Sequence, residues 1–135
     1  MIRLLVTGGT FDKEYDEIGG TLFFKDTHVQ EMLRLGRSRL DVAVETVMLI
    51  DSLQMTAGDR ERIAERCRGC EETQIVVTHG TDTMVDTAAV LAERVPGKTI
   101  VLTGAMIPYG AAAVRPILEQ FQRFTYTAPR HRGTC

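Results

Sequence analysis

The sequence predicts an α/β fold in which a mainly parallel sheet is covered by helices on both faces. Four short apolar runs are continuous rather than alternating, and segments with helical periodicity separate them. Continuous apolar runs are typical of strands buried on both faces, and strand–helix alternation with short connections is typical of βαβ units. We therefore expect a three-layer, doubly wound sheet of the flavodoxin or Rossmann type, with a flap hairpin near the N-terminus.

Each predicted strand is followed by small polar residues. The first predicted strand, Ile2 to Val6, is followed by Thr7-Gly8-Gly9-Thr10, and the second, Val42 to Ile50, by Asp51-Ser52. The third, Ile75 to Val77, is followed by Thr78-His79-Gly80-Thr81-Asp82, and the fourth, Ile100 to Leu102, by Thr103-Gly104-Ala105-Met106. Ligands of open α/β sheets bind beyond the carboxyl ends of the strands, so we expect these polar residues to meet at one edge. No fifth strand is apparent in the sequence.

Three helices are predicted between the strands. The first has a cap at Asp26 and an apolar face formed by Val29, Met32, Leu33 and Gly36. The second has the capping-box spacing at Thr56 and Asp59, followed by an apolar stripe of Ile63, Ala64 and Cys67. The third is a largely apolar segment from Thr81 to Val95, which ends at Pro96-Gly97. Phe11 to Lys25 contains Gly19-Gly20 and predicts a hairpin or flap. Such insertions often cover a site.

Composition narrows the classes of partner. The 135 residues suffice for one domain, and a net charge of -2 with a pI near 5.9 does not favour nucleic acid. No apolar run approaches the roughly 18 residues that span a membrane. Cys67 and Cys70 form a C-x-x-C without a second pair at zinc spacing, so we expect unpaired thiols in a reducing cytoplasm and no metal site.

The motifs that the sequence lacks exclude two kinds of chemistry for the polar residues at the carboxyl ends of the strands. It has neither a G-x-G-x-x-G nor a G-x-x-x-x-G-K-[ST] phosphate loop, and it has no G-x-S-x-G nucleophile elbow. A threonine can serve as a hydroxyl nucleophile without histidine, and Thr10 and Thr81 are the candidates. Taken singly, the polar segments can also be structural turns or, at Asp82, a helix cap. We expect His79 to be a packed or hydrogen-bonded residue rather than a proton shuttle, and Met84 and Met106 to belong to the core.

Four segments resemble one family in the same order. Thr7-Gly8-Gly9-Thr10-Phe11 and His79-Gly80-Thr81-Asp82-Thr83-Met84 resemble the two signature motifs of bacterial-type L-asparaginases, and Leu49 to Thr56 and Leu102 to Met106 resemble two further family segments. The resemblance covers about residues 2 to 109. It identifies 1–110 as an asparaginase N-terminal-type domain of the short, single-domain kind, and leaves 111–135 as a divergent tail.

The resemblance implies a role for each matching residue in the hydrolysis of L-asparagine to L-aspartate and ammonia. Thr10 would form the acyl-enzyme, Tyr15 on the flap would assist its proton transfer, and Thr81 would position the attacking group and help to hold the oxyanion. Asp82 would bind the α-ammonium group of L-asparagine or L-glutamine. Ser52, with Asp51 beside it, would bind the α-carboxylate, while Gly9 and Gly80 keep the backbone open. No cofactor is implied, and edge strands predict a homo-oligomer.

The sequence departs from the family pattern toward its C-terminus. The resemblance implies a catalytic lysine after the fourth strand, yet nothing after Lys98 is a lysine, and Lys98 precedes its strand. Lys13 and Lys25 lie on the predicted flap and could substitute only by chance. From Gly110 onward the tail resembles nothing in the family, which suggests truncation with a shifted reading frame. The alternatives to an active enzyme are therefore an impaired amino-acid-binding module and a truncated fragment.

Overall fold

The computed structural model describes residues 1–109 and 126–127, and its centre is a five-stranded sheet with the order β4-β1-β5-β6-β7. The strands of this sheet are β1 (Ile2–Val6), β4 (Val42–Thr46), β5 (Gln74–Thr78), β6 (Thr99–Thr103) and β7 (Tyr126–Thr127). The first four are parallel, and β7 pairs antiparallel with β6. The predicted mainly parallel sheet is confirmed, whereas the expectation of no fifth strand is wrong.

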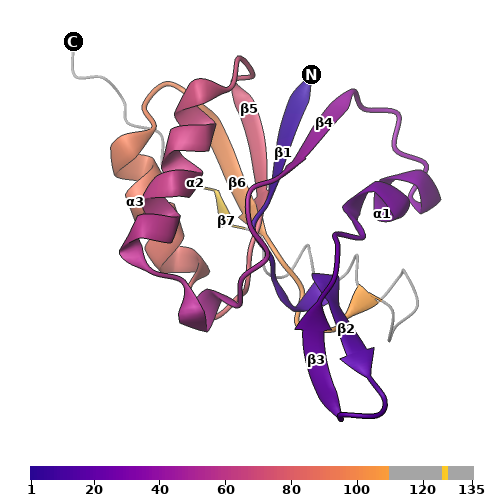
Figure 1. The fold of residues 1–135 in the computed structure, drawn as a ribbon. Coiled ribbons are helices and arrows are strands. Elements are labelled where there is room, and N and C mark those ends of the chain that lie inside the picture. The colour runs from indigo at the N-terminus through magenta and orange to yellow at the C-terminus, as the bar shows by residue number, and fades with distance from the viewer. Residues whose placement is uncertain (110–125, 128–135) are drawn as a thin grey trace.

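Helices cover both faces of this sheet. α2 (Ala57–Gly69) and α3 (Met84–Arg94) lie on one face, and the short α1 (Val29–Leu35) lies on the other (Figure 1). The predicted three-layer, doubly wound architecture is confirmed. Within the described ranges, none of the helices combines the length and the apolar character that crossing a membrane requires.

The strands alternate side chains between two cores because successive residues of a strand point to opposite faces. Leu5, Val77 and Leu102 pack beneath α2 and α3, while Leu4 and Val6 pack beneath α1. Both faces are apolar, which explains why the runs read as continuous in the sequence. Among the side chains expected to pack, Met84 is buried, but Met106 is 59% exposed, so that expectation was wrong.

The three helices begin where the sequence predicts in only one case. The α1 cap predicted at Asp26 is wrong, since the N-cap residue is His28 and the Asp12 carboxylate accepts the His28 N–H at 2.8 Å. The capping box of α2 is confirmed, with Thr56 and Asp59 bonded in both directions. α3 starts only at Met84, three residues later than the periodicity suggests.

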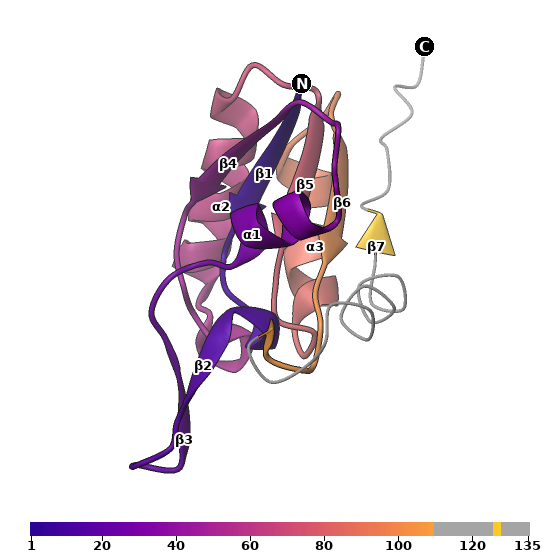
Figure 2. The ribbon, with the colours of Figure 1, turned by 90° about the vertical axis from the view of Figure 1, so that its right-hand side faces the viewer.

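The predicted flap is an antiparallel hairpin of β2 (Lys13–Asp16) and β3 (Thr21–Phe24). It follows the 3-10 turn η1 (Thr10–Asp12) and projects from the end of the sheet at which β1 finishes (Figures 1 and 2). The hairpin therefore stands beside the carboxyl ends of the parallel strands. The amphipathic helix that Ile117, Leu118, Phe121 and Phe124 could form lies outside the described residues.

Candidate functional site

Hydrogen bonds join the carboxyl ends of three neighbouring strands into one rigid edge. The Thr7 hydroxyl at the end of β1 donates to the Thr78 carbonyl of β5 at 2.6 Å, and the His79 N–H donates to the Thr103 carbonyl of β6 at 2.9 Å. The Ile50 N–H donates to the Thr7 carbonyl at 3.1 Å, which fastens the loop after β4 to the same edge. The polar segments predicted to meet are thus held side by side.

A small pocket opens at this edge, beside the start of the hairpin. The residues that line it are Gly9, Thr10, Lys13, Asp51, Ser52, Gly80 and Asp82. Its free space is about 10 Å³, room for roughly one water molecule. All of the predicted site residues except Tyr15 and Thr81 line this pocket, and Lys13 joins them.

Two glycines let the backbone segments approach closely at the pocket. Gly9 has a φ of 118°, a region that side chains rarely tolerate, and a Cβ there would lie 3.0 Å from the His79 carbonyl oxygen. A Cβ on Gly80 would lie 2.6 Å from Ser52 Oγ. Any larger residue at position 80 would therefore push Ser52 out of the pocket.

Ser52 is held by its backbone, and its hydroxyl has no hydrogen-bond partner in the part of the chain that the structure describes. The residue is 1% exposed, and its Oγ makes no hydrogen bond with the residues that the structure describes. Its carbonyl accepts from Thr83 Oγ1 at 2.9 Å, and Thr83 Oγ1 in turn accepts from Arg60 Nη2 at 3.1 Å. A buried, unpartnered hydroxyl costs free energy unless a ligand satisfies it. This hydroxyl is thus fixed in place and available to a ligand.

Lys13 and Asp51 form an ion pair inside the pocket. Lys13 Nζ lies 2.6 Å from Asp51 Oδ2, and the two side chains are 16% and 32% exposed. The hydrogen bond from Lys13 lowers the pKa of Asp51, and the Leu53 N–H, 3.0 Å from Oδ1, acts in the same direction. Both carboxylate oxygens of Asp51 therefore already accept hydrogen bonds within the protein.

His79 is a buried structural residue beneath the pocket. It is fully buried, and burial lowers its pKa. A neutral imidazole can donate from Nδ1 to the Gly80 carbonyl, 2.7 Å away, and accept at Nε2 from the Thr87 hydroxyl, also 2.7 Å away. Both nitrogens are satisfied in this way, and the expectation that His79 is a packed or hydrogen-bonded residue is confirmed.

Of the remaining predicted residues, Asp82 lines the pocket, whereas Thr81 and Tyr15 do not. Asp82 is exposed and forms no ion pair with another residue in the described ranges, so its carboxylate can receive a cation. Thr81 is half-buried and precedes the first turn of α3. Tyr15 is 58% exposed on β2, where it lies two residues beyond Lys13 and so shares its face of the strand.

Lys98 lies at the opposite edge of the sheet, as expected. Its ammonium donates to the Cys67 carbonyl at 2.6 Å and lies 3.5 Å from Cys70 Sγ. Both cysteines are free thiols, and burial raises the pKa of Cys67 to about 12. Lys98 therefore fixes the end of α2 and cannot reach Thr10.

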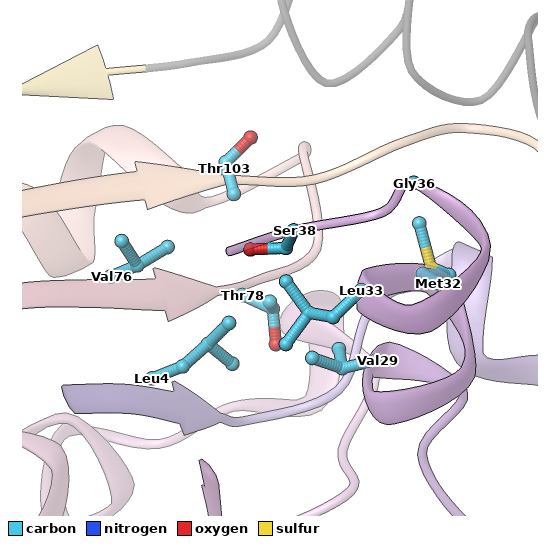
Figure 3. Close-up of a pocket in the computed structure, with 9 residues that line it drawn as sticks. All are labelled: Leu4, Val29, Met32, Leu33, Gly36, Ser38, Val76, Thr78 and Thr103. Atoms are coloured by element: carbon cyan, nitrogen blue, oxygen red, sulfur yellow. The ribbon is translucent and has the colours of Figure 1, made fainter. Parts of the chain in front are cut away.

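A larger cavity of about 330 Å³ lies between α1 and the sheet, away from these groups. Figure 3 shows its lining: Leu4, Val29, Met32, Leu33, Gly36, Ser38, Val76, Thr78 and Thr103. None of these side chains is titratable, so the cavity has no acid or base. The small pocket, by contrast, is lined by Thr10, Lys13, Asp51 and Asp82.

Sequence reasoning missed Lys13 as part of the pocket, because it placed Lys13 on the flap, where the lysine could replace the missing one only by chance. One signal could have placed it. Lys13 lies three residues after Thr10, and its N–H bonds to the Thr10 carbonyl, which closes the turn of η1. Residues at this spacing in a helical turn lie on the same side, so both side chains reach the pocket.

Comparisons with known proteins bear on the family and the fold of this chain. The family model described as asparaginase, N-terminal, matches residues 1–114. Among solved structures, the thermostable L-asparaginase from Thermococcus kodakarensis is 26% identical over 90% of this chain, with a TM-score of 0.69. The probable cytoplasmic L-asparaginase from Campylobacter jejuni is 30% identical over 79% of it, with a TM-score of 0.64.

L-asparaginase I from Vibrio cholerae is 20% identical over 88% of this chain, with a TM-score of 0.63, and this match shows the fold alone. The present chain covers 40%, 35% and 40% of the three proteins, in the order in which they are named here. It therefore spans well under half the length of these solved structures.

Proposed function

The chain belongs to the asparaginase family, and from this premise we propose that it hydrolyses L-asparagine to L-aspartate and ammonia with Thr10 as the nucleophile. The observation that carries the proposal is the pocket in which Thr10, Ser52 and Asp82 meet. A zwitterionic amino acid needs a carboxylate for its ammonium group and donors for its carboxylate. Asp82 and Ser52 supply these groups in the pocket that Thr10 also lines.

The proposed reaction proceeds in two steps. Thr10 Oγ attacks the carbon of the side-chain amide, its proton passes to the leaving nitrogen with the help of Tyr15, and ammonia departs to leave an ester. Water then attacks that ester carbon, which frees L-aspartate and returns the proton to Thr10. The Thr81 N–H contributes to holding the oxyanion of both tetrahedral intermediates. Because Tyr15 is exposed and does not line the pocket, its role requires the hairpin to bend toward Thr10.

Measurement of ammonia release from L-asparagine tests this proposal. We expect Thr10→Ala to lose at least about a hundredfold in rate, because a nucleophile acts as part of a unit. Thr73→Ala is the matched control, since Thr73 is exposed and lies just before β5, at the opposite edge of the sheet. Comparable activity in wild type and Thr10→Ala would refute Thr10 as the nucleophile.

A binding module without turnover is the second candidate function. It is favoured by the position of Lys98, which leaves the pocket without the lysine that the family pattern implies. Ser52 and Asp82 would still hold an amino acid. Calorimetric binding of L-aspartate without ammonia release from L-asparagine would favour this function over hydrolysis.

The proposed setting is a homo-oligomer in the cytoplasm. A cytoplasmic location is supported by the Campylobacter jejuni relative, a probable cytoplasmic L-asparaginase. Assembly is supported by the sheet, in which β4 is an edge strand. Light scattering over a range of protein concentrations tests the assembly, and a monomeric mass at every concentration would contradict it.

A further inference from the structure

The side chain of Lys13 is directed into the pocket rather than into solvent. The lysine is the first residue of β2, and it is only 16% exposed. Its Nζ lies 2.6 Å from Asp51 Oδ2 and 5.4 Å from the centre of the Phe24 ring. The loop after β4 and the paired strand β3 thus hold the ammonium between them.

The ammonium retains donor capacity after it pairs with Asp51. A lysine ammonium has three N–H donors, and one of them is used by Asp51 Oδ2. No other hydrogen bond from Lys13 Nζ is found within residues 1–109 and 126–127. The remaining donors lie beside the pocket that Thr10 also lines.

A second donor stands next to this ion pair. Ser52 follows Asp51 directly, and its buried Oγ lines the same pocket without a hydrogen-bond partner among the described residues. An ammonium and a hydroxyl side by side match the two oxygens of a carboxylate. Lys13 offsets the negative charge of Asp51, and Lys13 and the Leu53 N–H each bond to one of its two oxygens, which weakens its attraction for the substrate's ammonium group.

We infer that Lys13 binds the α-carboxylate of the amino acid together with Ser52, and that its charge allows an anionic group to enter beside Asp51. The inference rests on the proposed function for the class of ligand and adds a cation to its recognition. Asp82 then receives the α-ammonium group on the other side of the pocket. Lys13 is in this account a substrate-binding residue that distinguishes α-carboxylates from neutral α-substituents.

Calorimetry with two ligands tests this role. L-Aspartate carries the α-carboxylate, and L-aspartic acid α-amide replaces it with a neutral group. We expect Lys13→Met to weaken L-aspartate binding roughly 10- to 100-fold, as for the loss of a hydrogen bond from a charged group, and to change binding of the α-amide less than about threefold. Lys13→Arg should retain most of the affinity for L-aspartate, since it keeps a cationic donor.

Two further variants define the outcomes. Lys25→Met is the matched control, because Lys25 is an exposed lysine just after the hairpin, and it should bind both ligands as wild type does. The double variant Lys13→Met with Asp51→Asn should stay weak toward L-aspartate. Recovery of L-aspartate affinity in the double variant would show that Lys13 only neutralises Asp51. Equal weakening for both ligands in Lys13→Met would show that Lys13 only shapes the pocket. Either result would overturn the inference.

The inference and the proposed hydrolysis fail separately. Lys13-dependent binding of L-aspartate by a protein that releases no ammonia supports the inference and refutes the hydrolysis. If the protein releases ammonia but its affinity for L-aspartate does not depend on Lys13, the hydrolysis is supported and the inference is refuted. Absence of L-aspartate binding by the wild type overturns the inference.

Discussion

Substitution of Arg60 by methionine should destabilise the fold and loosen the pocket together. The Arg60 guanidinium, on α2, donates to Thr87 Oγ1 at 3.1 Å, to the Met55 carbonyl at 3.2 Å and to Thr83 Oγ1 at 3.1 Å. Thr83 Oγ1 in turn holds the Ser52 carbonyl. Arg60 thus links α2, α3 and the loop that carries Ser52.

The magnitude follows from these three hydrogen bonds. A hydrogen bond from a charged donor contributes about 1.5–3 kcal/mol to stability. Thr83 and Thr87 keep other partners, and the guanidinium is only half-buried, so the sum lies below three such bonds. We expect Arg60→Met to lower the free energy of unfolding by about 2–3 kcal/mol, which shifts Tm by roughly 6–12 °C in a domain of this size.

Urea denaturation followed by circular dichroism measures this loss, with the m-value as a check on the denatured state. Arg62→Met is the matched control, because Arg62 is exposed on the same helix, and it should change stability by no more than about 0.5 kcal/mol. Arg60→Lys should also lose most of the stabilisation, since one ammonium cannot span three acceptors in the guanidinium geometry. Equal losses in Arg60→Met and Arg62→Met would refute the reasoning.

Three other outcomes are expected. Gly80→Ala should lower the free energy of unfolding by about 1–3 kcal/mol and weaken L-aspartate binding, because its Cβ would lie 2.6 Å from Ser52 Oγ. Gly69→Ala should change neither quantity, because its Cβ would meet nothing within 4 Å. Chemical denaturation measures the first effect and calorimetry the second. Because the pKa of His79 is lowered in the folded protein, the unfolded state binds more protons, and the free energy of unfolding should fall as the pH decreases below about 6.5. Denaturation at pH 7.5 and at pH 5.5 should show this difference. His79→Gln should make the difference smaller. Cys67, whose burial raises its pKa to about 12, should resist iodoacetamide at pH 8 in the folded protein and react once urea unfolds it, as peptide mass mapping will show.

The sequence predicted the layers of the fold because layering depends on local patterns. Continuous apolar runs marked the strands, the i, i+3, i+4 spacing marked α1, and a narrow apolar stripe marked α2. The capping box of Thr56 and Asp59 was recognised for the same reason, since both partners lie within one turn. Helix starts that depend on distant partners were placed wrongly: the acid that bonds to the start of α1 is Asp12, sixteen residues from His28.

The same distinction separates the parts of the candidate site. Thr10, Ser52 and Asp82 could be proposed from the sequence because each lies in a polar segment after a predicted strand, and parallel strands bring their carboxyl ends to one edge. The contribution of Lys13 depends on the direction of a hairpin and on an ion pair across 38 positions of the chain. Neither is encoded in a local pattern.

The sequence by itself determined the order of the elements, the parallel sheet and the edge at which polar residues collect. Only the tertiary structure decided which side chains share the pocket there: Lys13 enters it, and the unpartnered Ser52 hydroxyl is buried within it. The physical reason is that periodicity reports the burial of neighbouring residues along the chain, whereas the pairing of charges and donors depends on contacts between segments that meet only after folding.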